Sequence, residues 1–221
     1  MSDIRKKIGW ADWSFNPVWG CLNDCPYCYA KGISRRFAVQ LSYWWDIPEE
    51  KFKKFLPIWI EKNFQKKIPN YAKHVFVNSM SDIMFWREEW FEKVLEKADL
   101  YPEKKFLFLT KSTNIFQVDY DRQNVFIGRT ITKNEDIALK DSIKDFYSIE
   151  PIHERINLNL IPKTLKQIIV GAETGNRKGK IIPSAEWIEE IREFCRDNEI
   201  KLYEKDSLKN IVKRELIQQK I

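Results

Sequence analysis

The sequence contains no long apolar run. None of its windows approaches the roughly 20 uninterrupted apolar residues that a helix needs to cross a bilayer. Its first residues, MSDIRKKIGWADW, also lack the apolar segment of a secretory signal. These absences predict a cytoplasmic protein that does not enter a membrane. In that reducing compartment a tight group of cysteines indicates metal binding or catalysis rather than disulfides.

The sequence also lacks internal repeats, low-complexity tracts and Gly/Ser linkers. At 221 residues, 43% of them hydrophobic, it has enough apolar material for one packed core. We therefore expect a single domain over residues 1–221.

Basic residues outnumber acidic ones by 38 to 32, and the stretch 51–73 carries seven Lys against one Glu. Such a stretch attracts phosphate groups and anionic ligands, although Lys-rich helix faces are commonly just solvated. An anionic substrate and a nucleic acid both remain open as partners.

Short β-rich segments alternate with longer amphipathic ones, which is typical of an α/β fold with a parallel sheet. The expected strands are residues 74–80, 105–110, 124–131, 145–151, 167–174 and 201–207, with a further extended segment near 13–18. The expected helices are residues 49–64, 88–101, 134–143 and 184–198. Cys195 falls on the apolar face of the last helix, where we expect it in the core.

Polar side chains follow the apolar part of every expected strand, as Asp82, Lys111, Glu150 and Glu173 do. Periodicity alone also allows an open doubly wound sheet. In a barrel, however, all strand ends converge on one mouth where active sites lie. We therefore expect a full or partial parallel (β/α) TIM-type barrel of about six to seven strands.

Three of the four cysteines, Cys21, Cys25 and Cys28, lie in the segment GCLNDCPYCYAKG with the spacing C-x3-C-x2-C. Three thiolates on one loop suit three corners of an iron–sulfur cubane, whereas a structural zinc site needs four ligands. A zinc knuckle that recruits Cys195 or His74 as its fourth ligand remains an alternative.

The segment CLNDCPYC, with an aromatic residue before the third cysteine, resembles the signature of radical S-adenosylmethionine (SAM) enzymes. The whole chain resembles the phage Gp37/Gp68-like family, a DUF5131-type group. The matching segments are SFNPVWGC, CYAK, VFVNSMSD, FLTK, FIG, SIEP, VGAETG and EFC, in that order. Lys31, Ala172 and Lys205 depart from that family's pattern.

The resemblance implies a [4Fe–4S] cluster held by Cys21, Cys25 and Cys28, with SAM bound to the iron that has no protein ligand. It also implies reductive cleavage of SAM to a 5′-deoxyadenosyl radical that acts on an unidentified substrate. The electron donor expected for this chemistry is a flavodoxin or a ferredoxin.

Further roles follow from position near the motif and at the strand ends. Expected cofactor-binding residues are Tyr27, Asn78, Ser79, Asp82, Thr110 and Glu173. The ring of Tyr27 can pack against adenine, or it can support the loop. The carboxylate of Asp82 can bind an ammonium group, or it can cap the N-terminus of the following helix. The segment GAETG, residues 171–175, can bring its backbone close to the ribose of the cofactor, or it can simply form a turn.

Expected catalytic residues are Lys111, Glu150 and Glu173, because an ionisable group at a barrel mouth can carry protons or pair with a substrate anion. A structural ion pair between Lys111 and either carboxylate is the competing interpretation. The loop with Arg177, Lys178 and Lys180 is a further candidate for an anionic substrate. The paired Trp44 and Trp45 look unlike a helix interior and are expected to cover the cluster. The alternative function is a nucleic-acid-binding protein with a structural metal knuckle and no catalysis.

Overall fold

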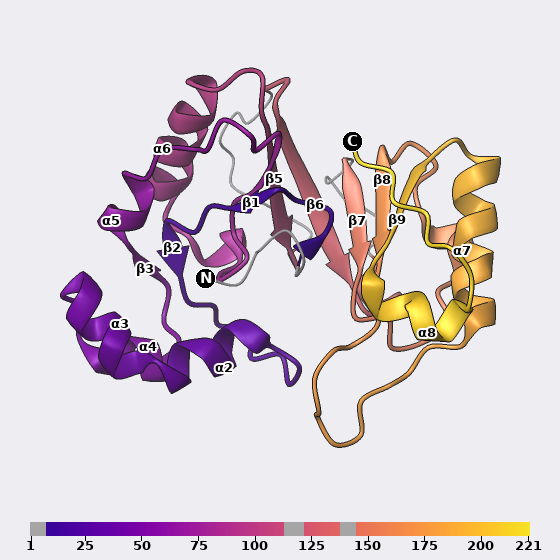
Figure 1. The fold of residues 1–221 in the computed structure, drawn as a ribbon, viewed down its shortest axis with the longest axis horizontal. Helices are drawn as coiled ribbons and strands as arrows, with labels where there is room; N and C mark the ends of the chain where they lie inside the picture. Colours follow the sequence, from indigo (N-terminus) through magenta and orange to yellow (C-terminus); the bar gives the residue numbers. More distant parts are fainter. Residues whose placement is uncertain (1–7, 113–121, 138–144) are drawn as a thin grey trace. The chain divides into compact units, whose positions relative to one another are not determined.

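Figure 1 shows the computed structural model, which describes residues 8–112, 122–137 and 145–221. These residues form two compact units. The first holds residues 11–109 and 122–125, and the second holds residues 8–10, 110–112, 126–137 and 145–221. The expectation of a single domain stays a prediction.

The first unit contains three parallel strands and a small antiparallel pair. The parallel strands are β1 (Trp13–Ser14), β4 (His74–Phe76) and β5 (Lys105–Thr110). In their register Trp13 pairs with Val75, which pairs with Phe106. The antiparallel pair consists of β2 (Val18–Trp19) and β3 (Ile58–Trp59). Val75 and Phe106 are fully buried, so these short strands carry the core of this unit.

Helices of the first unit are α2 (Tyr29–Arg36), α3 (Ala38–Trp45), α4 (Glu49–Lys54), α5 (Glu61–Phe64) and α6 (Glu88–Asp99), with the 3₁₀ turn η1 (Ile83–Phe85). The expected helix 88–101 is confirmed by α6. The single helix expected over 49–64 is wrong, because α4 ends at Phe55 in a left-handed conformation with a φ of 57°. Pro57, which cannot donate to a continuing helix, then leads into β3.

Sequence reasoning missed α2 and α3. The segment AVQLSYWW of α3 shows no clean amphipathic period, because Val39, Tyr43 and Trp44 are exposed although they are apolar. Trp44 and Trp45, which looked unlike a helix interior, occupy the last turn of α3. Their expected position over the cluster stays a prediction. Trp45 packs edge-on against Trp19 with ring centroids 4.9 Å apart.

The second unit contains four parallel strands in the order β6-β7-β8-β9. They are β6 (Val125–Ile131), β7 (Phe146–Ile149), β8 (Gln167–Val170) and β9 (Lys201–Glu204). Ile149 pairs with Val170, which pairs with Glu204, so the carboxyl ends of these strands align. All six expected strands from residue 74 onward therefore exist within their expected ranges.

Helix α7 (Ala185–Asp197) covers the second unit's sheet with Ile188, Ile191 and Cys195. Ser184 caps it, and Cys195 is 2% exposed, which confirms both the helix and the core position of that cysteine. The remaining elements are the 3₁₀ turns η2 (Asn134–Asp136), η3 (Leu158–Leu160) and η4 (Asp206–Leu208) and the helix α8 (Lys209–Val212).

The helix expected over 134–143 begins as η2, and its residues 138–143 lie outside the described residues. The predicted mixed α/β class with parallel strands is confirmed, while closure into a TIM-type barrel stays a prediction. In the described part of the chain, no helix combines the length and apolar character needed to span a bilayer.

Candidate functional site

The cysteine loop lies in the first unit, between β2 and α2, and Gly20 sets its start. Gly20 has a φ of 103°, and a Cβ at this position would lie 1.9 Å from the carbonyl oxygen of Leu56. Its N–H donates to the carbonyl of Met80 at 3.0 Å, and the N–H of Cys21 donates to that of Phe55 at 2.9 Å. Only glycine fits this close approach, so the position of Cys21 depends on it.

Two of the three thiols accept backbone hydrogen bonds. The sulfur of Cys21 accepts from the N–H of Asn23 at 3.5 Å. The sulfur of Cys28 accepts from the N–H of Lys31 at 3.4 Å and thereby caps the N-terminus of α2. N–H donors and a helix N-terminus both favour a negatively charged sulfur. All three cysteines are half-buried, and none forms a disulfide.

Burial raises the pKa of the Cys21 thiol to about 12, with further contributions from the negative charges of Asp82, Cys25 and Cys28. The N–H of Asn23 acts in the opposite direction. Within the described residues, no three side chains of His, Cys, Asp or Glu come close enough together to hold a metal ion. The three thiols therefore share one loop without converging on a common point.

Asp82 links the loop that follows β4 to the cysteine loop. Its carboxylate accepts from the side-chain amide of Asn23 at 2.8 Å and from the N–H of Met84 at 3.1 Å. The second contact caps η1, so the interpretation of Asp82 as a helix cap is confirmed for a 3₁₀ turn. Its expected contact with a cofactor stays a prediction.

Ser79 and Asn78 also connect backbone segments of this region. The hydroxyl of Ser79 donates to the side chain of Asn16 at 3.1 Å, and its carbonyl accepts from the Tyr29 hydroxyl at 2.7 Å. The buried amide of Asn78 accepts from the N–H of Leu109 at 2.9 Å and donates to the carbonyl of the same residue. Asn78 thus ties the end of β4 to β5, and cofactor binding by either residue remains a prediction.

Tyr27 and Thr110, two further residues expected to bind the cofactor, lie on different segments of the chain. Tyr27 lies half-buried between Cys25 and Cys28 on the cysteine loop. Thr110 ends β5, is 1% exposed, and accepts from the N–H of Ser112 at 3.0 Å. The Thr110 hydroxyl therefore supports the turn that follows its strand.

In the second unit, Glu150 and Glu173 lie just beyond the ends of β7 and β8. Glu150 forms an ion pair with Lys205, which follows β9. Gly171 makes room for this pair, because a Cβ there would lie 3.1 Å from both side chains.

Glu173 is held by Arg177 and His153. Arg177 donates through two nitrogens at 2.6 and 2.7 Å, and Nε2 of His153 lies 3.5 Å from the carboxylate. The hydrogen bonds from Arg177 hold the pKa of Glu173 below its ordinary value, although burial acts against them. The Arg177 guanidinium, expected to face an anionic substrate, is instead engaged with Glu173.

Lys111 is half-buried, and its positive charge contributes to lowering the pKa of Asp136. Burial opposes that shift, while hydrogen bonds from the hydroxyl and the N–H of Thr132 dominate it. The ion pairs described for Glu150 and Glu173 are with Lys205 and Arg177. A pairing of Lys111 with either carboxylate stays a prediction.

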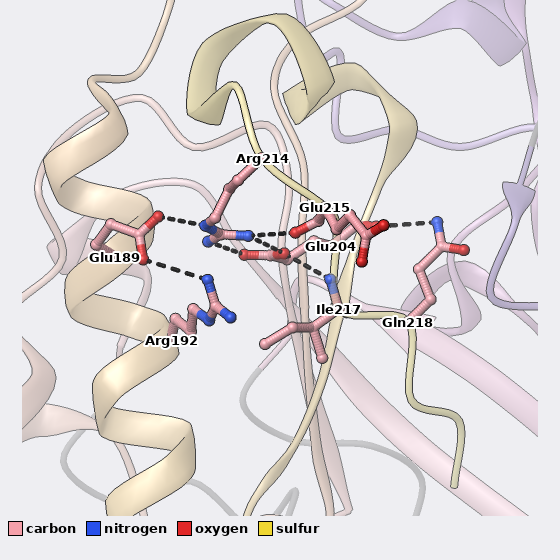
Figure 2. A network of polar contacts seen from close by, with 7 residues as sticks. All are labelled: Glu189, Arg192, Glu204, Arg214, Glu215, Ile217 and Gln218. Carbon is pink, nitrogen blue, oxygen red and sulfur yellow. Dashed lines mark hydrogen bonds and ion pairs between the residues drawn. The ribbon is translucent and has the colours of Figure 1, made fainter.

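Sequence reasoning missed the network around Glu204 (Figure 2). The carboxylate of Glu204 is fully buried at the end of β9 and accepts two hydrogen bonds from Arg214, at 2.8 and 2.9 Å. Arg214 also contacts Glu189 of α7 at 2.6 Å. No sequence signal pairs Glu204 with Arg214, because ten residues of irregular spacing separate them.

The chain was compared with known proteins. A family model described as a protein of unknown function (DUF5131) matches residues 5–214. No curated protein matches the chain. No solved structure matches it either. Since the family model covers nearly the whole length, the chain belongs to the DUF5131 family.

Proposed function

We propose that this protein is a radical SAM enzyme that acts on a substrate still to be identified. In this proposal Cys21, Cys25 and Cys28 hold a [4Fe–4S] cluster, and SAM occupies the iron without a protein ligand. The observation that carries the proposal is the placement of three thiols on one loop while the other thiol and both imidazoles are engaged elsewhere.

The partners of the remaining candidate ligands support an open coordination position. Cys195 is buried in the core of the second unit. His74 lies with Nδ1 3.3 Å from Asp12, and His153 lies beside Glu173. A structural zinc site needs a fourth ligand, so these contacts favour the cluster over the zinc knuckle.

The chemistry of the loop also fits a cluster. Cys21 and Cys28 accept backbone N–H groups, as sulfur ligands of clusters commonly do. Both pack with Trp19 against the same apolar group of Ala30, Phe55 and Met80. The buried indole N–H of Trp19 has no hydrogen-bond partner among the described residues, which leaves a donor for an additional acceptor in this region. Because the three sulfurs do not converge on one point in this structure, the proposal includes a tightening of the loop when a cluster binds.

A [4Fe–4S] cluster held by Cys21, Cys25 and Cys28, with SAM bound to it, would supply one-electron reductive chemistry, for which the electron would come from an external flavodoxin- or ferredoxin-type donor. The chain's own residues position and shield this reaction. Asp82 and Ser79 offer a carboxylate and a hydroxyl to the ammonium group of SAM, and Tyr27 offers a flat ring to adenine. The hydroxyl of Thr110 and the amide of Asn78 keep the loops that border this site in place.

Lys111, Glu150 and Glu173 are proposed to bind the substrate or hold its protons. The Glu150–Lys205 and Glu173–Arg177 ion pairs hold both carboxylates in place, which suits them to orient a polar substrate. The proposal includes a barrel-type arrangement of the parallel strands, in which residues at the carboxyl ends of strands serve one site.

Anaerobic reconstitution with iron and sulfide tests the proposal. Wild-type protein and the matched control Cys195→Ala are expected to bind about four irons, the content of one [4Fe–4S] cluster, and to release 5′-deoxyadenosine from SAM with dithionite. Cys21→Ala, Cys25→Ala and Cys28→Ala should each lose both properties. A wild-type protein that binds zinc tetrahedrally and never an iron–sulfur cluster would overturn the proposal.

A further inference from the structure

The net charge of the chain is concentrated in one segment of the first unit. Residues 29–73 hold ten Lys and Arg against four Asp and Glu, an excess of six that equals the net charge of the whole chain, +6. This segment contains α2, α3 and α4, which lie next to one another in Figure 1. The rest of the chain carries no net charge, and residues 29–54, which hold the three helices, carry half of the excess, with six Lys and Arg against three Asp and Glu. This charge suits the segment to attract a polyanion.

The same three-helix group exposes aromatic rings. Tyr29 and Trp44 are each 58% exposed, Phe37 is 42% exposed, and Tyr43 is 86% exposed. Tyr29 begins α2 and Phe37 directly follows its last residue, so the two exposed rings lie at the two ends of this helix. The inward faces of these helices already supply their core through Ala38, Leu41 and Phe52. The outward rings are not part of that core.

Basic groups lie beside these rings. The guanidinium carbon of Arg36 lies 5.9 Å from the centre of the Phe37 ring. The ammonium group of Lys62 donates to the carbonyl of Trp44 at 2.8 Å. Lys53 and Lys54 are paired with Glu49 and Glu50 and contribute less to the excess. Positive groups alternating with flat exposed rings match a strand of phosphates that carries unpaired bases.

We propose that α2, α3 and α4 form a binding surface for single-stranded nucleic acid, with Tyr43 and Trp44 stacking on bases and Arg36 contacting phosphate. A duplex hides the faces of its bases, so exposed rings favour a single strand. Tyr29 directly follows Cys28, and its hydroxyl is bonded to the carbonyl of Ser79. The surface thus begins at the cysteine loop, and a bound strand leads to the site of the proposed chemistry.

This inference goes beyond the proposed function, because binding is measured on protein without any cluster. Fluorescence anisotropy with labelled oligothymidylate and oligouridylate of about 12 nucleotides gives the affinity. We expect binding that weakens steeply between about 50 and 200 mM salt. Tyr43→Ala and Trp44→Ala should each weaken it about tenfold, and Arg36→Gln should reduce the salt slope by about 0.7.

Two control variants match these changes. Tyr71→Ala removes a ring that is also 58% exposed but precedes β4, and Lys163→Gln removes an exposed charge of the second unit. Both should bind like wild type, and circular dichroism checks that every variant is folded. Absence of binding to both oligonucleotides overturns the inference, as does equal weakening by the control variants. Binding to phosphatidylserine vesicles without binding to oligonucleotides also overturns it. If the protein binds the oligonucleotides but does not form a cluster or cleave SAM, that result contradicts only the proposed function.

Discussion

Two nitrogens of Arg214 donate hydrogen bonds to the fully buried carboxylate of Glu204, at 2.8 and 2.9 Å, and its third nitrogen donates to Glu189 of α7. The same carboxylate accepts from the N–H of Ile217 at 2.7 Å. One guanidinium therefore joins β9, α7 and the C-terminal segment of the second unit (Figure 2). The charge of Arg214 is what makes a carboxylate tolerable inside this core.

Replacing Arg214 with alanine is the first test of this relationship. Arg214→Ala leaves the Glu204 carboxylate buried and unpaired, which should lower the free energy of unfolding by about 3 kcal/mol. Arg192→Ala is the matched control, because Arg192 lies 3.6 Å from Glu189 and does not contact Glu204. Urea unfolding followed by circular dichroism measures both, and equal effects of the two variants would contradict the structural role.

The six strands from β4 to β9 were predictable because their signal is local. The segment QIIV at β8 is buried throughout, and three of its four residues, Ile168, Ile169 and Val170, are β-branched and favour strands. The break between α4 and α5 was missed, since Phe52, Phe55 and Trp59 recur at the i, i+3 and i+7 positions of one apolar helix face. There tertiary packing outweighs the local pattern.

Thiol reactivity should separate Cys195 from the cysteine loop. Burial raises the pKa of Cys195 to about 12, helped by the charge of Glu204, and the side chain is 2% exposed. We expect iodoacetamide at pH 8 to modify Cys25 and Cys28 in the folded protein, and Cys195 only after unfolding, as read by mass spectrometry. Cys21 should react slowly, because burial raises its pKa to about 12 as well.

Reconstitution provides the internal control for this experiment. A bound cluster should protect the three loop thiols and leave Cys195 unchanged. Modification of native Cys195 as fast as Cys25 would show that α7 does not shield it.

A pair of glycine substitutions tests how the cysteine loop is anchored. Gly20→Ala forces a Cβ into the carbonyl of Leu56 at a positive φ, so it should lower the free energy of unfolding by about 2 kcal/mol. Gly32→Ala is the control on the adjacent helix α2, where a Cβ meets nothing within 4 Å. It should raise stability by about 0.5–1 kcal/mol. Thermal unfolding measures the stability of both variants. If the unfolding temperature shifted in the same direction in both, the steric argument would be refuted.

The Glu173–Arg177 pair predicts acid sensitivity. Hydrogen bonds from Arg177 hold the pKa of Glu173 below its ordinary 4.5. The stabilisation is therefore fully present above pH 4.5 and is lost as pH falls through the lower folded-state value. The stability difference between wild type and Glu173→Gln should be largest near neutrality and shrink toward about pH 3.

Urea unfolding at several pH values measures that difference. Glu186→Gln, which alters an exposed carboxylate in the first turn of α7, is the control and should show no comparable pH dependence. A difference for Glu173→Gln that stays constant down to about pH 3 would mean that the ion pair does not form.

Only part of the candidate site was predictable, because some of its residues are close in the sequence and others are brought together only by the fold. Ligand spacing within one loop is visible in the sequence, so the three cysteines stand out. The partners of Glu150 and Glu173 are Lys205 and Arg177. Lys205 is 55 residues from Glu150, and which pairs form depends on strand register and on room such as that left by Gly171.

Asn78 offers the last test, because its structural and cofactor roles predict different results. Its amide bridges Leu109 through both N–H and carbonyl, so Asn78→Ala should leave buried backbone groups unpaired and cost about 2 kcal/mol of stability without any cofactor. Ser79→Ala is the comparison variant, since the Ser79 hydroxyl bonds only a side chain, Asn16, among the contacts described. If Asn78 acts only as a bridge, temperatures low enough to keep the variant folded will restore wild-type SAM affinity in the reconstituted protein. If SAM affinity stays reduced under those conditions while unfolding is unchanged, the amide contacts the cofactor and the bridge is secondary.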